Sequence, residues 1–179
     1  MAKVIAKTYG DALFDLAMEQ DRLAETEAEI SLLSQSFEEN PELLAFLNHP
    51  KITKEEKIRV MEQILRGRVD DTVTGFLVLI VDKGRYNEIA AIFDYFHARV
   101  REYNKVGVAK IVSAAALNEE QKQRIESKLL EQTSYESFET DYRVDPALIG
   151  GMVIRIGDRV VDSSIRTKLE TMSKVLKSR

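Results

Sequence analysis

The chain has 179 residues, of which 44% are hydrophobic, and a formal net charge of −4, so it has room for one ordinary domain or two small ones with a buried core. The absence of cysteine excludes disulfides, a thiol nucleophile and thiolate metal sites. No apolar stretch approaches the ~20 residues that span a bilayer, and the N-terminus lacks the apolar core of a secretory signal, so we expect a soluble globular protein that is not exported.

Negative charge gathers at the start of the chain. Residues 1–38 carry three Lys or Arg and eight Asp or Glu, so 3 − 8 gives −5, and residues 39–179 therefore sum to +1. An acidic segment disfavours contact with a nucleic-acid backbone and suits a basic partner. A solvated helix face is the other explanation.

The first segment predicts a helix with a wide apolar arc. The residues that recur at helical spacing are Ile5, Tyr9, Ala12, Leu13, Leu16 and Ala17. Phe14 and Met18 widen the arc beyond the ~100° that one core stripe needs. We therefore expect this helix to contact more than one neighbour.

Capping residues and helix breakers delimit the next three predicted helices. The second helix ends at Asn40, which is predicted to cap a short third helix with Pro41 in its first position. Thr53 and Glu56 form a capping box that opens the fourth helix, and Gly67 ends that helix.

A six-residue apolar run lies within residues 69–83 and fits either a buried strand or a helix. Asp70 and Asp71 at its start and Lys83 at its end match the capping and dipole preferences of a helix, so a fifth helix is predicted. A clear amphipathic pattern then predicts a sixth helix that ends near Asn104.

The pattern changes from helical to alternating after residue 105, which indicates a domain boundary there. A strand over residues 106–112 is followed by a helix over 118–130 and a candidate strand over 135–144. The sequence therefore predicts an α+β protein, with an N-terminal six-helix bundle in residues 1–105. A small C-terminal α/β domain with a short sheet and two helices would occupy residues 106–179.

The C-terminal segment predicts a hairpin followed by an amphipathic helix. Residues 152–156 and 159–161 are two short apolar strands around the turn pair Gly157-Asp158. Asp162, Ser163 and Ser164 offer capping oxygens to the last helix. The apolar stripe of that helix consists of Ile165, Leu169, Met172 and Leu176. We expect this stripe to pack down on the hairpin.

No catalytic, cofactor or metal site emerges from the residue pattern. His49 and His97 have no partner at metal or triad spacing. Gly150 and Gly151 are not part of a phosphate-binding motif. Asp158 and Asp162 could form a metal or acid/base pair, but a turn residue and a helix cap explain them better.

Two predicted helices carry more apolar surface than a core stripe needs. The surplus consists of Tyr9, Ala12 and Leu16 on the first helix and of Phe76 and Leu79 on the fifth. Helices that are apolar on more than one face either lie centrally in a bundle or present a groove to another helix. The residues alone leave both possibilities open.

The segment IGGMVIRIGDRVVDSSIRTKLE, residues 149–170, resembles the C-terminal signature of the delta subunit family of F-type ATP synthases, which includes the oligomycin-sensitivity-conferring protein. The opening IAKTYGDALFDLA and the segment DKGRYNEI are also similar to that family, so the resemblance covers the whole chain. One departure is Ser163, where the family often has glycine, which leaves the local turn geometry open.

The resemblance implies a non-catalytic stator subunit of the peripheral stalk, without cofactors, that keeps the catalytic head from turning with the rotor during ion-driven ATP synthesis. Residues 1–105 would bind the N-terminal helix of an alpha subunit of the head, and residues 106–179 the C-terminal ends of the b subunits. The expected alpha groove is lined by Tyr9, Ala12, Leu16, Phe76 and Leu79, with Asp15 and Glu19 at its rim. The expected b contacts are Ile165, Leu169, Met172 and Leu176.

The implied location is peripheral, on the cytoplasmic face of a bacterial cell membrane and attached only through the complex, with a thylakoid location still open. Two other classes of function stay open on the residues. A helical RNA-binding or antitermination-like module would need a basic face, against which the acidic N-terminus argues. A small hydrolase or metal enzyme would have to use Asp158 and Asp162.

Overall fold

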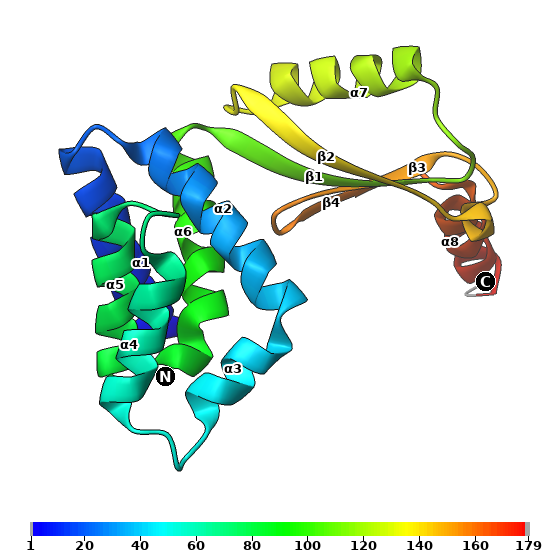
Figure 1. Cartoon of the computed structure of the whole chain (residues 1–179). Helices are drawn as coiled ribbons and strands as arrows, with labels where there is room; N and C mark the ends of the chain where they lie inside the picture. The colour runs from blue at the N-terminus through cyan, green and yellow to red at the C-terminus, as the bar shows by residue number, and fades with distance from the viewer. Residues whose placement is uncertain (1, 178–179) are drawn as a thin grey trace. The chain divides into compact units, whose positions relative to one another are not determined.

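The computed structural model describes residues 2–177 and divides into two compact units, Met1–Val100 and Arg101–Arg179 (Figure 1). The division after Val100 falls within the last turn of α6. The boundary expected near residue 105 lies a few residues after this division, between the end of α6 at Tyr103 and the start of β1 at Val106. Within the described residues no helix is both long and apolar enough to cross a bilayer.

The N-terminal unit contains the six predicted α-helices and one short 3-10 turn that the sequence did not indicate. They are α1 (Ala2–Glu19), α2 (Leu23–Glu39), α3 (Pro41–Asn48), α4 (Lys54–Leu65), α5 (Asp71–Asp82), the 3-10 turn η1 (Tyr86–Glu88) and α6 (Ile89–Tyr103). The ambiguous apolar run is thus helical, as its terminal charges predicted.

Local capping explains most of these helix boundaries. Asp70 caps α5 by accepting from the amide of Thr72 (2.9 Å), and Thr53 caps α4 by accepting from the amide of Glu56 (3.3 Å). The prediction that Asn40 caps α3 is wrong. Its side chain turns back and donates to the carbonyl of Ser36 (2.8 Å), so it satisfies the C-terminal end of α2 instead.

The core of this unit is continuous and aromatic-rich. Its largest fully buried side chains come from all six helices and include Leu13, Ile30, Leu47, Met61, Leu77, Ile92, Phe93 and Phe96. Burying each such side chain contributes roughly 1.5–3 kcal/mol relative to leaving it in water. Packing rather than helix propensity therefore holds the bundle together.

The C-terminal unit is a four-stranded sheet with strand order β2-β1-β3-β4. Its elements are β1 (Val106–Ser113), α7 (Glu119–Gln132), β2 (Ser137–Val144), the 3-10 turn η2 (Pro146–Leu148), β3 (Met152–Ile156), β4 (Arg159–Asp162) and α8 (Ile165–Lys177). β1 and β2 are parallel with α7 as their crossover, whereas β1–β3 and β3–β4 are antiparallel. The α+β fold class is confirmed, and the predicted hairpin is present as β3–β4.

Among the described residues of the C-terminal unit, α7 covers one face of this sheet. α7 lies along one face of the sheet (Figure 1), and its Leu129 and Ile125 pack with Ala109 and Ile111 of β1. Alternation along each strand directs the intervening side chains of β1, β2 and β3 to the opposite face. The small second core is therefore one-sided.

The helix α8 does not behave as the sequence predicted. Ser164 caps it, accepting from the amide of Thr167 (3.3 Å). Its apolar stripe, expected to pack on the hairpin, is exposed instead, from 43% at Ile165 to 76% at Leu176. The periodicity correctly shows which side of the helix is apolar, but among the described residues Ile165 lies against Gly150 while Leu169, Met172 and Leu176 are more than half exposed.

Candidate protein-binding surfaces

The expected groove residues of α1 and α5 meet at one aromatic contact. The rings of Tyr9 and Phe76 lie edge to face with centroids 6.4 Å apart. Phe76 is only 8% exposed and belongs to the core, while Tyr9 is half-buried against it. Phe76 is thus mainly a packing residue, and Tyr9 is the part of this pair that reaches the surface.

The other residues of this flank are more accessible. Leu79 of α5 is 45% exposed, Leu16 of α1 is half-buried, and Ala12 is exposed. We refer to Tyr9, Ala12, Leu16, Phe76 and Leu79 together as the α1/α5 flank. Asp15 and Glu19, expected at its rim, are both exposed on α1. The flank therefore offers a modest apolar strip beside negative charge.

An ion-pair network fixes the N-terminal end of α5 against the turn between α1 and α2. Arg22 in that turn donates to Asp70 (2.5 Å) and to Glu25 (2.6 Å). The hydrogen bond from Arg22, with those from Thr72, holds the pKa of the Asp70 carboxyl well below its usual range. Glu29 of α2 also accepts from the amide of Asp70 (3.1 Å). This network sets where α5 begins relative to α1 and α2.

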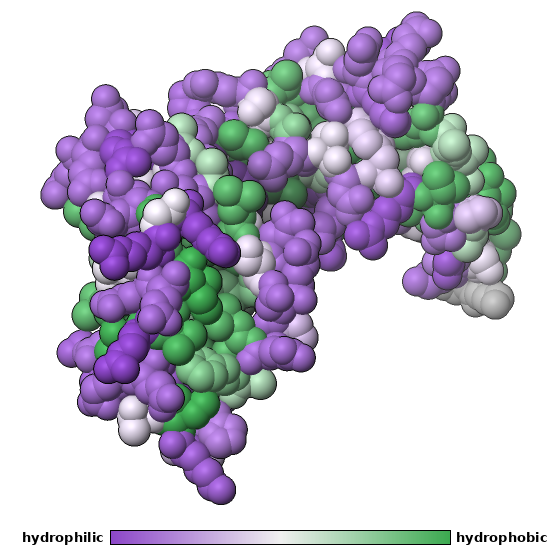
Figure 2. Space-filling model, viewed as in Figure 1, coloured by the Kyte–Doolittle hydropathy of each residue, from purple (hydrophilic) through white to green (hydrophobic). Residues whose placement is uncertain are grey.

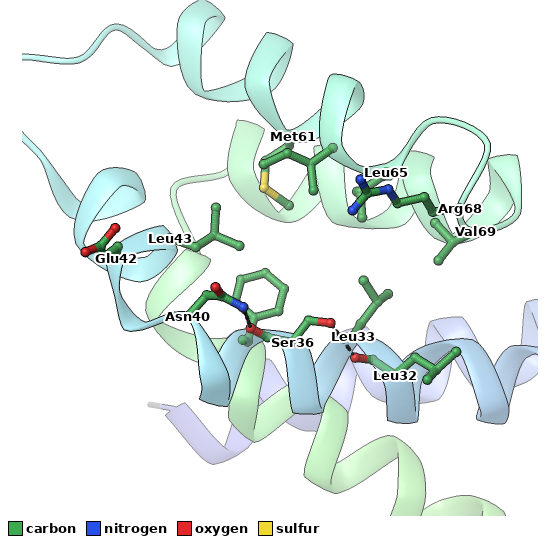
Figure 3. A pocket seen from close by; sticks show the side chains of 12 residues that line it. Leu32, Leu33, Ser36, Asn40, Glu42, Leu43, Met61, Leu65, Arg68 and Val69 are labelled. Carbon is green, nitrogen blue, oxygen red and sulfur yellow. Dashed lines mark hydrogen bonds between the residues drawn. The ribbon is translucent and has the colours of Figure 1, made fainter.

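A second apolar surface of this unit was not anticipated. α2, α3 and α4 surround a hollow of about 600 Å³, in which Leu33, Leu43, Met61 and Leu65 face one another (Figure 3). Figure 2 shows apolar surface gathered over this hollow. Leu32, at its edge, is 64% exposed. We call this surface the α2–α4 hollow.

The apolar stripe of α8 forms the third surface. Ile165, Leu169, Met172 and Leu176 lie on one side of the helix and are 43%, 52%, 62% and 76% exposed. Figure 2 shows apolar surface over the region of α8. An exposed apolar stripe at helical spacing is typical of a helix that binds another helix.

Asp158 and Asp162 do not form the metal or acid/base pair that was considered for them. Asp162 accepts from the amide of Ser164 (2.8 Å) and the hydroxyl of Thr167 (2.7 Å), which lowers the pKa of its carboxyl. Asp162 thus holds the residues at the start of α8, which Ser164 caps, and Asp158 lies in the β3–β4 turn. No cluster of three or more His, Cys, Asp or Glu within residues 2–177 could hold a metal ion.

Comparison with known proteins gives a match over nearly the whole chain. The family pattern of the ATP synthase delta (OSCP) subunit matches residues 5–176. ATP synthase subunit delta of Lachnoclostridium phytofermentans is 57% identical over 176 residues, covering 98% of this chain and 97% of that protein. The chloroplastic ATP synthase subunit delta of Ochrosphaera neapolitana is 32% identical over 172 residues, covering 96% of each chain.

A solved structure has the same fold. A chain of the Toxoplasma gondii mitochondrial ATP synthase hexamer, solved by cryo-EM, superposes with a TM-score of 0.71 and 21% sequence identity, covering 96% of both chains. At that identity the similarity supports the fold alone. It agrees with the α+β architecture described above.

Proposed function

This chain belongs to the ATP synthase delta (OSCP) subunit family, and we propose that in the assembled enzyme it joins an alpha subunit of the catalytic head to the b subunits. It is a structural component of the peripheral stalk of an F-type ATP synthase, not a catalytic subunit. An RNA-binding role finds no support among its relatives. Its association with the membrane follows from the complex, and we propose the cytoplasmic face as its location.

Head binding is assigned to residues 1–105. The proposed site is the α1/α5 flank, where an amphipathic N-terminal helix of an alpha subunit would lay its apolar side against Leu79, Leu16 and Tyr9. Two observations support this site: Leu79 is 45% exposed on a helix whose other large apolar side chains are mostly buried, and the rim residues Asp15 and Glu19 are negative. A helix with a basic flank would fit both features.

Stalk binding is assigned to residues 106–179. The C-terminal ends of the b subunits would seat on Ile165, Leu169, Met172 and Leu176 of α8. The observation that carries this part is the exposure of the whole stripe, because an apolar row of this size stays in water only where a partner normally covers it. The two sites lie in different units, so one chain can hold two partners at once.

A stator joint must persist through many catalytic turnovers. A complex that lasts this long requires nanomolar affinity, which corresponds to a binding free energy of about −12 kcal/mol. A few large apolar side chains at the centre of each interface can supply most of that free energy. We therefore expect single substitutions at Leu79 or Met172 to have large effects on binding.

Size-exclusion chromatography of the purified full chain mixed with purified catalytic head tests the first half of this proposal. One-to-one co-elution is expected. Separate elution of the two at micromolar concentration would show that the chain does not bind the head.

A further inference from the structure

The face of the sheet that α7 leaves uncovered carries two cations in direct opposition. Lys110 of β1 pairs with Arg155 of β3 in the antiparallel register. Side chains at opposed positions have their Cβ atoms about 4.5–5.5 Å apart, and like charges in that arrangement destabilise the pair. Both side chains are exposed, and neither makes a hydrogen bond or ion pair with any described residue.

The neighbouring acidic groups are already engaged. Asp141 of β2 lies beside Lys110 in the parallel register but accepts from Arg143 of its own strand (3.0 Å). Glu139, one step along β2 on the same face, pairs with Arg101 (3.4 Å). Asp162 of β4 accepts from the amide of Ser164 and the hydroxyl of Thr167. Among the described residues, neither Lys110 nor Arg155 therefore has an ion-pair partner of its own, and Asp141, the neighbour of Lys110, is shared with Arg143.

The surface around these cations is shaped to receive side chains. Val112, Val153 and Val160 flank them and help to line a shallow hollow of about 270 Å³. Apolar side chains that surround two unpaired cations match a partner that is itself amphipathic and acidic.

This face is continuous with the start of α8. Val153 pairs with Asp162, which accepts from the amide of Ser164 just before α8, and Arg155 follows two residues after Val153 on the same face of β3. Two residues of a strand span about 7 Å. A partner segment that continues from the first turn of α8 onto this face of β3 would come within side-chain reach of Arg155.

We propose that the uncovered sheet face binds carboxylates of the b subunit segment that seats on α8. The inference rests on the proposed stalk function and adds a chemical requirement to it: the b segment presents Asp or Glu to Lys110 and Arg155 as well as apolar side chains to α8. Repulsion between the opposed cations destabilises the sheet locally, and the carboxylates of the partner would offset this repulsion.

The test compares Arg155→Glu with Lys128→Glu in the full chain. Both variants change the charge by the same amount, but Lys128 lies exposed on α7, and α7 covers the opposite face. The probe is the purified soluble region of the b subunit of the same enzyme, titrated by calorimetry at several NaCl concentrations. Thermal unfolding of each variant is measured in parallel.

We expect Arg155→Glu to weaken b binding at least 10-fold at 0.1 M NaCl and to flatten its salt dependence, while Lys128→Glu changes the affinity less than about twofold. Arg155→Glu should also keep or raise the unfolding temperature of the C-terminal unit, by roughly 1–4 °C, because it converts an opposed cation pair into an ion pair. A variant that binds worse while being no less stable excludes unfolding as the cause.

Binding of b by Arg155→Glu within twofold of the unsubstituted chain would overturn this inference and leave the stalk function intact. Failure of the unsubstituted chain to bind b at all would overturn the stalk proposal and the inference together.

Discussion

The ring of Tyr9 in α1 meets the ring of Phe76 in α5 edge to face, with centroids 6.4 Å apart. Phe76 is 8% exposed and belongs to the core, and Tyr9 packs against that core. Replacing Phe76 with a charged residue would therefore bury an unpaired charge and damage the fold. Leu79, on the exposed side of the same helix, is the residue whose substitution separates binding from folding.

Leu79→Asp should weaken binding of a peptide with the alpha N-terminal sequence by at least ~2 kcal/mol, roughly 30-fold, because it places a charge in the centre of the proposed apolar contact. Leu32→Asp is the matched control, since Leu32 is 64% exposed at the edge of the α2–α4 hollow. Fluorescence anisotropy with the full chain measures both. If only Leu32→Asp loses affinity, the alpha helix lies in the α2–α4 hollow instead.

Two helical glycines should respond in opposite directions to alanine. A Cβ on Gly10 of α1 would collide with the ring of Tyr95, whose hydroxyl is anchored on Asp11 (3.0 Å), whereas a Cβ on Gly75 of α5 meets nothing within 4 Å. Gly10→Ala should cost about 1–3 kcal/mol through overpacking. Gly75→Ala should stabilise by about 0.5–1 kcal/mol. Urea unfolding checks the signs, and equal effects would contradict the close approach of α1 and α6.

The Arg22–Asp70 pair should make the N-terminal unit acid-sensitive. Because the folded-state pKa of Asp70 is depressed, its contribution to stability is fully present above its ordinary pKa of about 4 and is lost as the pH falls below that value. Asp70→Asn should therefore lower the urea midpoint at pH 6, and the difference from the unsubstituted chain should shrink toward pH 2.

Asp94→Asn serves as the control, since Asp94 is exposed and has no hydrogen-bond or ion-pair partner among the described residues. Its difference from the unsubstituted chain should stay small across this range. A gap between Asp70→Asn and the unsubstituted chain that does not change with pH would contradict the linkage.

Substitution on the α8 stripe should remove stalk binding without unfolding the sheet. Met172→Asp changes a side chain that is 62% exposed, so it removes no core contact, and we expect at least a 10-fold loss of affinity for the soluble b region. Ser173→Asp adds the same charge at the next position, which points about 100° away around the helix. Equal losses from both variants would mean that general charge, not the apolar stripe, governs binding.

The helices of the N-terminal unit were predictable because the residues at their ends determine where they begin and end, independently of distant parts of the chain. Asp70 and Pro41 mark the starts of α5 and α3 by properties of the residues themselves, whatever the rest of the chain does. The cap of α3 failed as a prediction because Asn40 sits between two helices, and its side chain can serve either the end of α2 or the start of α3.

Surfaces formed by residues distant in sequence were not predictable in the same way. The opposition of Lys110 and Arg155 depends on the pairing of β1 with β3, after β1 has also paired in parallel with β2. No local pattern sets that register. The periodicity of α8 showed which side is apolar but not that this side is uncovered, and the α2–α4 hollow arises only when α3 and α4 stand apart above α2.

A bridging pull-down tests the central claim most directly, that this one chain connects the head to the b subunits. The soluble b region is immobilised, and purified catalytic head is added with or without the chain. We expect the head to be retained only when the chain is present. At low nanomolar concentrations, less head should be retained with Leu79→Asp, which itself stays on the beads, and less of both chain and head with Met172→Asp. Retention of the head on b without the chain, or a chain that holds either partner but never both, would contradict the account.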